Sequence, residues 1–185
     1  MHGWPRKKYT LVAIVTLIIY ILIVPNEYTV QFDTNINGVE AVIIWEFVAD
    51  FNNMKKLNPT IINFTITYDY GSYDNWQYGV YYTEYLSTIP LIKNSADGHY
   101  QVKKLQDKSY AIYSNHKTCF IGNIYCLKSN SSFTFNEEIS AIIRTYIQET
   151  ITYECPRILS KLCHNEVMFQ RKHIFNNLKR ILSKN

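Results

Sequence analysis

The chain has 185 residues, of which 47% are hydrophobic, 15% aromatic and 18% charged; this composition excludes a disordered chain and, with 16 tyrosines, favours strands over a helical bundle. Its length fits one domain with a substantial hydrophobic core. The net charge of +4 does not indicate a nucleic-acid partner, because Arg6, Lys7 and Lys8 precede every acidic residue and the remainder carries 16 basic against 15 acidic residues.

Residues 9–24 form an uncharged apolar run of 16 residues that follows the basic segment 1–8. As a helix this run would be roughly 24 Å long, close to the lower limit for the hydrocarbon core of a bilayer. Since basic flanks stay on the cytosolic side, we predict a transmembrane signal-anchor helix in a single-pass membrane protein of the secretory pathway. Residues 27–185 would then form a lumenal or extracellular domain. The alternative is a cleaved signal peptide and a secreted domain, although residues 21–27 lack the small side chains of a cleavage site.

The rest of the chain predicts one strand, two short helices, six strands and a long helix. The first strand covers residues 28–33. Helical spacing of apolar residues predicts a helix over 39–52, and a second helical turn at 55–57 ends before Asn58-Pro59, because a residue preceding proline avoids the α region. Alternating residues between turn signals predict strands at 62–70, 76–87, 100–106, 109–120, 124–135 and 141–154. Pro156 suits a first helical position, and an apolar stripe follows it over 156–182.

A hairpin turn at Gly122-Asn123 sets the register of the strands on either side of it. A two-residue turn at this point pairs Ile112 with Phe133 on one face of the sheet and Cys119 with Cys126 on the other. N-glycosylation sequons begin at Asn63 and Asn130, each on the polar face of its strand. The chain is therefore predicted to be a glycoprotein.

All four cysteines follow the apolar run, which suits an oxidising compartment. Cys119 and Cys126 lie opposite each other in the predicted hairpin, so we expect a disulfide bond between them. For Cys155 and Cys163 two alternatives remain, because a regular helix would separate them by about 12 Å: an irregular first turn lets them bond, or both are buried apolar side chains. A zinc site that adds His164 and His173 is not expected without paired ligand spacing, and the sequence indicates no metal and no cofactor.

Residues 39–59 resemble the beginning of START-like domains of the polyketide cyclase (SRPBCC) superfamily. In those domains a Trp-Glu-x-x-x-Asp-[FW] helix precedes a Leu-Asn-Pro or Trp-x-Pro turn, and the matching residues here are Trp45, Glu46, Asp50, Phe51, Leu57, Asn58 and Pro59. The resemblance implies an α+β helix-grip fold, a seven-stranded curved antiparallel sheet wrapped on the long C-terminal helix, here preceded by one transmembrane helix. It further implies an internal cavity for a hydrophobic ligand, but no catalytic residues, because the superfamily shares none.

Inward-facing strand positions give the expected lining of such a cavity: Phe64, Ile66, Tyr68, Tyr82, Ile112, Leu127, Phe133, Ile143, Ile147, Glu149 and Ile151. Glu149 is the candidate for catalysis, because a carboxyl among isoleucines can orient a ligand hydroxyl or act as a base. We favour the alternatives, in which a bulge turns Glu149 outward or a nearby Lys pairs with it. Glu84 and His116 are further inward polar positions. The basic residues of the last helix, Arg171 among them, are expected on a solvated face, with a membrane-facing stripe as the alternative.

The leading hypothesis is a membrane-tethered lumenal binder or carrier of a lipid or another hydrophobic small molecule. The first alternative is a cyclase- or isomerase-type enzyme that acts on a hydrophobic substrate through Glu149, Tyr82 or His116. The second alternative is a protein-interaction module with a solid core. Nucleic acid enters none of these hypotheses, because the net positive charge comes from residues before the apolar run, and the chain has no glycine-rich phosphate-binding motif.

Overall fold

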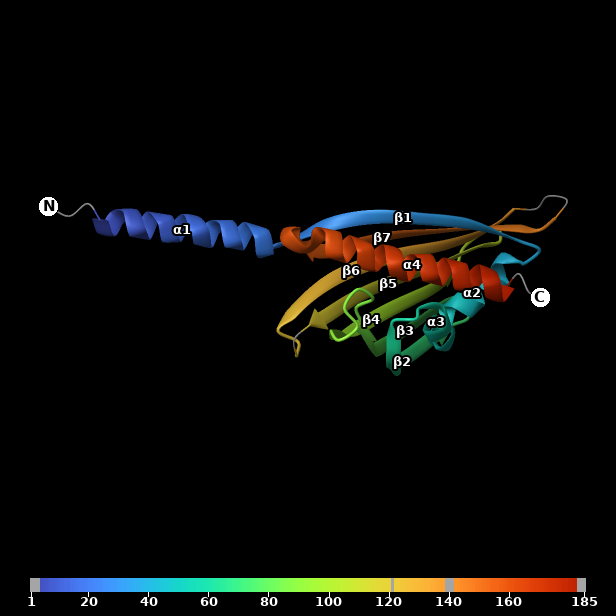
Figure 1. Cartoon of the computed structure of the whole chain (residues 1–185). Coiled ribbons are helices and arrows are strands. Elements are labelled where there is room, and N and C mark those ends of the chain that lie inside the picture. Colours follow the sequence, from blue (N-terminus) through green and yellow to red (C-terminus); the bar gives the residue numbers. More distant parts are fainter. Residues whose placement is uncertain (1–3, 121, 139–141, 183–185) are drawn as a thin grey trace.

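A computed structural model describes residues 4–120, 122–138 and 142–182, with side chains from Lys8 onwards. A 20-residue helix comes first, followed by a strand, two short helices, six strands, a turn of 3-10 helix and a long final helix (Figure 1). Their bounds are α1 (Trp4–Ile23), β1 (Pro25–Asn37), α2 (Ala41–Ala49), α3 (Phe51–Leu57), β2 (Ile61–Ser72), β3 (Asn75–Tyr85), β4 (Lys93–Lys104), β5 (Ser109–Phe120), β6 (Tyr125–Glu138), β7 (Arg144–Pro156), η1 (Arg157–Leu159) and α4 (Ser160–Leu182).

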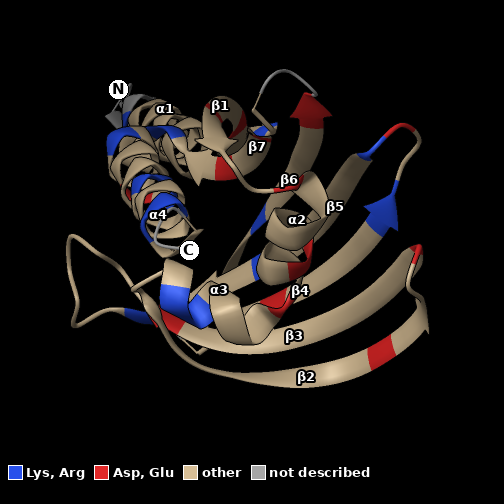
Figure 2. Cartoon of the chain, turned by 90° about the vertical axis from the view of Figure 1, so that its right-hand side faces the viewer, with Lys and Arg blue, Asp and Glu red and all other residues tan. Residues whose placement is uncertain are grey.

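The seven strands form one curved antiparallel sheet in the order β1-β7-β6-β5-β4-β3-β2. Helix α4 lies on the concave side of this sheet, and α2 and α3 lie on the same side (Figure 2). The arrangement is the helix-grip α+β fold that the element order predicted. Register in the β5–β6 hairpin is also as predicted, with Ile112 opposite Phe133 and Cys119 opposite Cys126.

The apolar segment is helical, as predicted, and α1 projects away from the domain (Figure 1). Apart from Leu22, every side chain described in α1 is exposed. Within the described residues no helix combines the length and the apolar character needed to cross a bilayer, so the predicted spanning helix is not found. Residues 1–3 of the predicted basic segment lie outside the described part of the chain.

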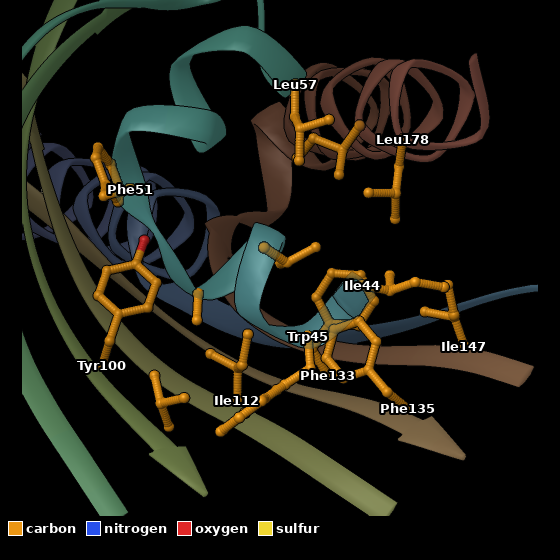
Figure 3. Close-up of a cluster of buried hydrophobic side chains, with 14 of the residues drawn as sticks. Ile44, Trp45, Phe51, Leu57, Tyr100, Ile112, Phe133, Phe135, Ile147 and Leu178 are labelled. Atoms are coloured by element: carbon orange, nitrogen blue, oxygen red, sulfur yellow. The ribbon is translucent and has the colours of Figure 1, made fainter. Parts of the chain in front are cut away.

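The core is centred on the residues that carry the START-like resemblance, where α2 packs against the sheet. Figure 3 shows Trp45 of α2 near Phe133 and Phe135 of β6, and all three belong to one cluster of buried side chains. Trp45 is 2% exposed, and its Nε1 donates to the carbonyl oxygen of Ala111 at 3.2 Å. Burial of an aromatic side chain with its one polar group satisfied contributes strongly to stability. Trp45 is therefore a structural anchor of the domain.

Asp50 and Asn58 of the same motif form the junctions around α3. The backbone at Asp50 is extended, so the helix predicted over 39–52 is two helices, and the Asp50 carboxylate accepts from the Asn52 backbone N–H at 2.9 Å. This is an N-cap interaction. Beyond α3, Asn58 Oδ1 accepts from the Thr60 backbone N–H at 3.1 Å, and the Pro59 carbonyl accepts from Tyr85 Oη at 3.0 Å. Each of these contacts sets the direction of the chain.

Several element boundaries differ from the prediction, β1 being longer because it covers Pro25–Asn37, and two of the differences have identifiable reasons. Strand β4 starts at Lys93, whereas the prediction started at Tyr100; the first seven residues, Lys-Asn-Ser-Ala-Asp-Gly-His, have low strand propensity and were therefore missed. Helix α4 starts at Ser160 rather than Pro156, because Pro156 still belongs to β7 and the next three residues form η1. The first residue of the predicted strand at 141–154 lies outside the described residues.

Candidate functional site

A cavity of about 360 Å³ lies between α4 and the concave face of the sheet. Its wall is mainly apolar and comes from β3 to β7, the β3–β4 connection, η1 and α4. The apolar side chains in its lining are Leu86, Ile92, Phe120, Tyr125, Leu127, Ile151, Tyr153, Leu159, Leu162 and Val167. The volume is within the range of small-molecule sites, about 300–1,000 Å³. The interior is therefore not solid.

A smaller chamber of about 50 Å³ adjoins this cavity on the side of α2 and α3. Five polar residues line both spaces and so separate them: Tyr82, Glu84, His116, Gln170 and Arg171. We call these five residues the polar ring. An elongated ligand with an apolar body in the larger cavity would place one end at the polar ring.

Arg171 and Glu149 form an ion pair at the inner chamber. Arg171 Nη1 lies 3.1 Å from Glu149 Oε1, which also accepts from Ser131 Oγ at 2.7 Å. The other carboxylate oxygen, Oε2, and the Arg171 Nε are buried without a hydrogen-bond partner among the described residues. Because unpaired buried polar atoms are costly, these two are available to a polar group of a ligand.

Glu84 is the second buried carboxyl at the polar ring. Its Oε2 accepts from Thr60 Oγ1 and from Gln170 Nε2, each at 3.3 Å. Burial, and then the negative charge of Glu166, raise the pKa of Glu84 to about 7. Gln170 Nε2 also donates to Glu166 Oε1 at 3.1 Å, so one amide connects the two carboxyl groups. Near neutral pH, Glu84 can therefore exist as a neutral hydrogen-bond donor or as an anion.

Tyr82, His116 and Ser114 form a hydrogen-bonded chain on the sheet side of the ring. Tyr82 Oη lies 3.1 Å from His116 Nδ1, and His116 Nε2 lies 2.9 Å from Ser114 Oγ. Burial, and then the positive charge of Arg171, lower the pKa of His116 to about 3, so its imidazole is neutral. Burial also raises the pKa of Tyr82 well above its ordinary value. This part of the ring is uncharged at physiological pH and offers both donors and acceptors.

Six of the predicted lining residues line one or both spaces: Tyr82, Ile112, Leu127, Phe133, Glu149 and Ile151. Glu149 points inward, and its partner is Arg171 from α4, so neither the outward bulge nor the Lys pairing occurs. Arg171 therefore does not lie on the solvated face of α4, where it was expected. The α4 residues Glu166, Gln170 and Arg171 were missed as a group, although Arg171 stands at helical spacing from Val167 and Ile174 of the apolar stripe.

Five predicted lining residues do not contribute to either space. Phe64 packs on Phe51, with ring centroids 5.0 Å apart, and Ile147 is fully buried in the core. Ile143 precedes β7 and is exposed, so it faces no cavity. The other two, Ile66 and Tyr68, lie on the edge strand β2.

A register shift in β2 explains the error at these two positions. The shift between Ile66 and Tyr68 reverses the alternation, as expected of a β-bulge. Tyr68 therefore lies on the outer face, where its ring covers Gly79 and its Oη lies 2.9 Å from His99 Nδ1. Ile66 keeps the inner parity, opposite Val80, but is 41% exposed at the sheet edge.

Two disulfide bonds lie next to the larger cavity. Cys119 and Cys126 are bonded across the β5–β6 hairpin, as predicted, with Cα atoms 4.0 Å apart. Cys155 and Cys163 are also bonded, because the 3-10 turn η1 brings their Cα atoms to 6.3 Å. Since both thiols of this pair are oxidised, they are not available to a zinc ion. The sequon residues Asn63 and Asn130 are exposed on their strands.

Comparison with solved structures shows the same fold in distant proteins. An uncharacterised protein from Rhizobium leguminosarum matches 88% of this chain and 99% of its own, with a TM-score of 0.54 and 8% identity. A conserved protein from Geobacillus kaustophilus matches 85% of this chain and 96% of its own, with a TM-score of 0.54 and 10% identity. A third structure, that of Ara h 8.0201, matches 86% of this chain and all of its own, with a TM-score of 0.52 and 12% identity.

These likenesses support the helix-grip fold, and the fold alone, because the identities are low. No protein-family model and no curated protein matches the sequence. The function must therefore be argued from the cavity itself.

Proposed function

We propose that the chain is a carrier of a lipid or another hydrophobic small molecule, bound between α4 and the sheet. The observation that carries this proposal is the apolar-walled cavity of about 360 Å³, which a solid helix-grip domain would fill with its own side chains. In the proposed complex, the apolar body of the ligand lies against Leu127, Ile151 and Leu162. A polar end, such as a hydroxyl or carbonyl group, reaches the polar ring.

Charge balance at the ring favours a neutral polar end over a carboxylate. Arg171 is already paired with Glu149 at 3.1 Å, and His116 is uncharged. A second anion at this position would face Glu84, Glu149 and Glu166 with one guanidinium between them. Repulsion in a poorly hydrated site disfavours that arrangement.

Native mass spectrometry and lipid analysis of the purified full chain test the carrier directly. We expect a co-purifying hydrophobic molecule, or saturable uptake of a long-chain alcohol from solution. A chain that neither retains nor takes up any hydrophobic molecule is not a carrier.

We further propose that α1 attaches this carrier to a membrane of the secretory pathway. In support, α1 presents apolar side chains that no other part of the described chain covers, and such surfaces normally find a lipid or protein partner. Two disulfide bonds and two exposed sequon asparagines agree with an oxidising compartment. Flotation of the expressed chain with membranes, and a mobility change on removal of N-glycans, are the expected results; a chain that stays soluble and unglycosylated would contradict this part.

An enzyme that acts on a hydrophobic substrate is the second candidate. The observation in its favour is Glu84, whose pKa of about 7 suits a general acid or base, at the junction of the two spaces. On this hypothesis a Glu84→Gln variant still binds the ligand but no longer converts it. If the ligand is recovered unchanged from both the wild type and the variant, the enzyme hypothesis is wrong and only the carrier hypothesis remains.

A further inference from the structure

The outer end of the larger cavity is bordered by three segments, which we call the rim segments. They are the β3–β4 connection at 86–92, the β5–β6 turn at 122–124, and η1. Leu86, Ile92 and Leu159 from these segments line the cavity, together with Phe120 and Tyr125 beside the turn. A ligand that enters from the end opposite the inner chamber therefore passes between the rim segments.

Each rim segment presents a large apolar side chain to solvent at its tip. Leu91 is 94% exposed, Ile124 83% and Ile158 64%. Neighbouring Ile89, Ile92 and Leu159 add further exposed apolar surface. Three exposed tips around one cavity form a patch of the kind that soluble proteins use for binding.

The rim segments are also held in place, so their tips are not simply loose ends. The Cys119–Cys126 disulfide closes the hairpin below the turn, and Ser95 Oγ donates to Asn123 Oδ1 at 3.1 Å. The Cys155–Cys163 disulfide spans η1. Glu166 Oε2 accepts from the backbone N–H and the hydroxyl of Ser87, at 2.8 and 2.6 Å, which ties the third segment to α4.

The apolar helix α1 ends beside this patch. Its contacts include η1, and Tyr125 Oη lies 3.4 Å from the carbonyl oxygen of Ile23. Figure 1 places the end of α1, the start of α4 and the β5–β6 hairpin at the same end of the domain. Two apolar surfaces from distant parts of the sequence thus meet at the outer end of the cavity.

Charges around the rim segments favour an anionic partner. Five exposed basic residues lie in the rim segments or within five residues of them along the chain, namely Lys93, Lys117, Lys128, Arg157 and Lys161. Only three carboxylates that are not buried lie on the adjoining strands near the rim segments: Glu27, Asp97 and Glu154. Apolar tips that insert beneath the headgroups, with basic residues beside them, are typical of proteins that lie on an anionic bilayer surface.

We propose that the rim segments dock on a bilayer, with Leu91, Ile124 and Ile158 inserted below the headgroups, so that the cavity opens directly to the lipid. This inference rests on the proposed function for the nature of the cargo. Docking would let an apolar ligand pass between bilayer and cavity without crossing water. Because α1 would keep the domain at the surface, even weak insertion of the three tips would be populated.

Tryptophan scanning of the full chain tests the docking. Leu91→Trp, Ile124→Trp and Ile158→Trp variants are mixed with vesicles of phosphatidylcholine and phosphatidylserine whose acyl chains are brominated, and wild-type fluorescence is subtracted. Ile142→Trp is the matched control, because Ile142 is 66% exposed and precedes β7, whose other end leads into η1. We expect quenching of the three rim variants and none of the control.

The docking proposal is wrong if the rim variants are quenched no more than the Ile142→Trp control. It is also wrong if the chain does not float with the vesicles. Uptake of a long-chain alcohol by the vesicle-free chain is measured in parallel. Uptake without quenching removes the docking and leaves the carrier, whereas quenching without uptake removes the carrier and leaves the docking. An Ile124→Asp variant adds a second readout: vesicle binding through the rim falls, while uptake from solution does not change.

Discussion

Removal of the Arg171 guanidinium is expected to destabilise the domain through Glu149. The Glu149 side chain is 2% exposed and that of Arg171 is 20% exposed, so an Arg171→Met substitution leaves a buried carboxylate without its counter-charge. Breaking one side of a buried ion pair costs about 3–5 kcal/mol, and the partial exposure of Arg171 favours the lower end, about 3 kcal/mol. For a chain of this size that corresponds to a loss of roughly 6–12 °C in Tm.

Urea unfolding and thermal unfolding of the purified variant measure this loss. Arg180→Met on the exposed face of α4 is the matched control, and its effect is expected to remain within about 0.5 kcal/mol. A Glu149→Leu/Arg171→Met double variant is expected to recover most of the stability, because an apolar pair of similar volume avoids the desolvation of two charges. The ion pair does not have this role if Arg171→Met costs no more than Arg180→Met. It does not have it either if the loss in the double variant equals the sum of the losses in the Glu149→Leu and Arg171→Met single variants.

Three further outcomes follow from the site. Burial raises the pKa of Glu84 from 4.5 to about 7, so the native state holds this proton more tightly than the unfolded state. Roughly 3 kcal/mol of stability is therefore lost as the pH rises from about 4.5 to above 7. Unfolding measured against pH is expected to show this slope in the wild type and not in a Glu84→Gln variant. Thr118→Trp, on the cavity wall, is expected to abolish uptake of a long-chain alcohol, whereas Lys117→Trp on the outer face leaves it intact, and equal uptake by both would place the ligand elsewhere. The free energy of unfolding of a Cys119→Ser/Cys126→Ser variant, measured in urea, is expected to fall by about 2.5 kcal/mol, the chain-entropy value for a disulfide that joins residues seven apart. A loss near zero would mean that the hairpin does not need the bond.

The sequence predicted the fold well where local signals and long-range packing agree. The β5–β6 hairpin is an example, because Gly122 and Asn123 have the positive φ that its tight turn requires, at +62° and +71°. Trp45 and the Asn58-Pro59 turn were equally informative, since they direct α2 and α3 onto the sheet. Such positions determine the framework of the domain.

The errors lie where the local sequence does not reveal the course of a strand. The local sequence of β2 does not indicate the shift between Ile66 and Tyr68. The shift accompanies a long-range contact, the packing of Tyr68 over Gly79 on the neighbouring strand. Strand β4 was shortened in the prediction because its small and polar residues have low strand propensity, although Ala96 and Gly98 occupy buried positions.

The candidate site was only half predictable, because it is shared between the sheet and α4. Alternation along β7 gave Glu149 an inward position, but an outward bulge or a Lys partner was favoured. Its actual partner is 22 residues further along the chain, on a helix whose charges were assigned to solvent. A pair of this kind is defined by how helix and sheet pack together. The raised pKa of Glu84 has the same origin, since it comes first from burial between sheet and helix and then from the charge of Glu166 on α4.

The irregular course of β2 has a consequence for the behaviour of the sheet towards other chains. Among the residues that the structure describes, no strand pairs with the outer edge of β1 or of β2, and a flat, regular edge is a template for aggregation. The two register shifts of β2, at Ile61/Asn63 and Ile66/Tyr68, interrupt the straight row of backbone groups that an incoming strand would need. The bulge that misled the prediction of the inner face thus makes the β2 edge a poorer template for pairing with a second copy of the chain.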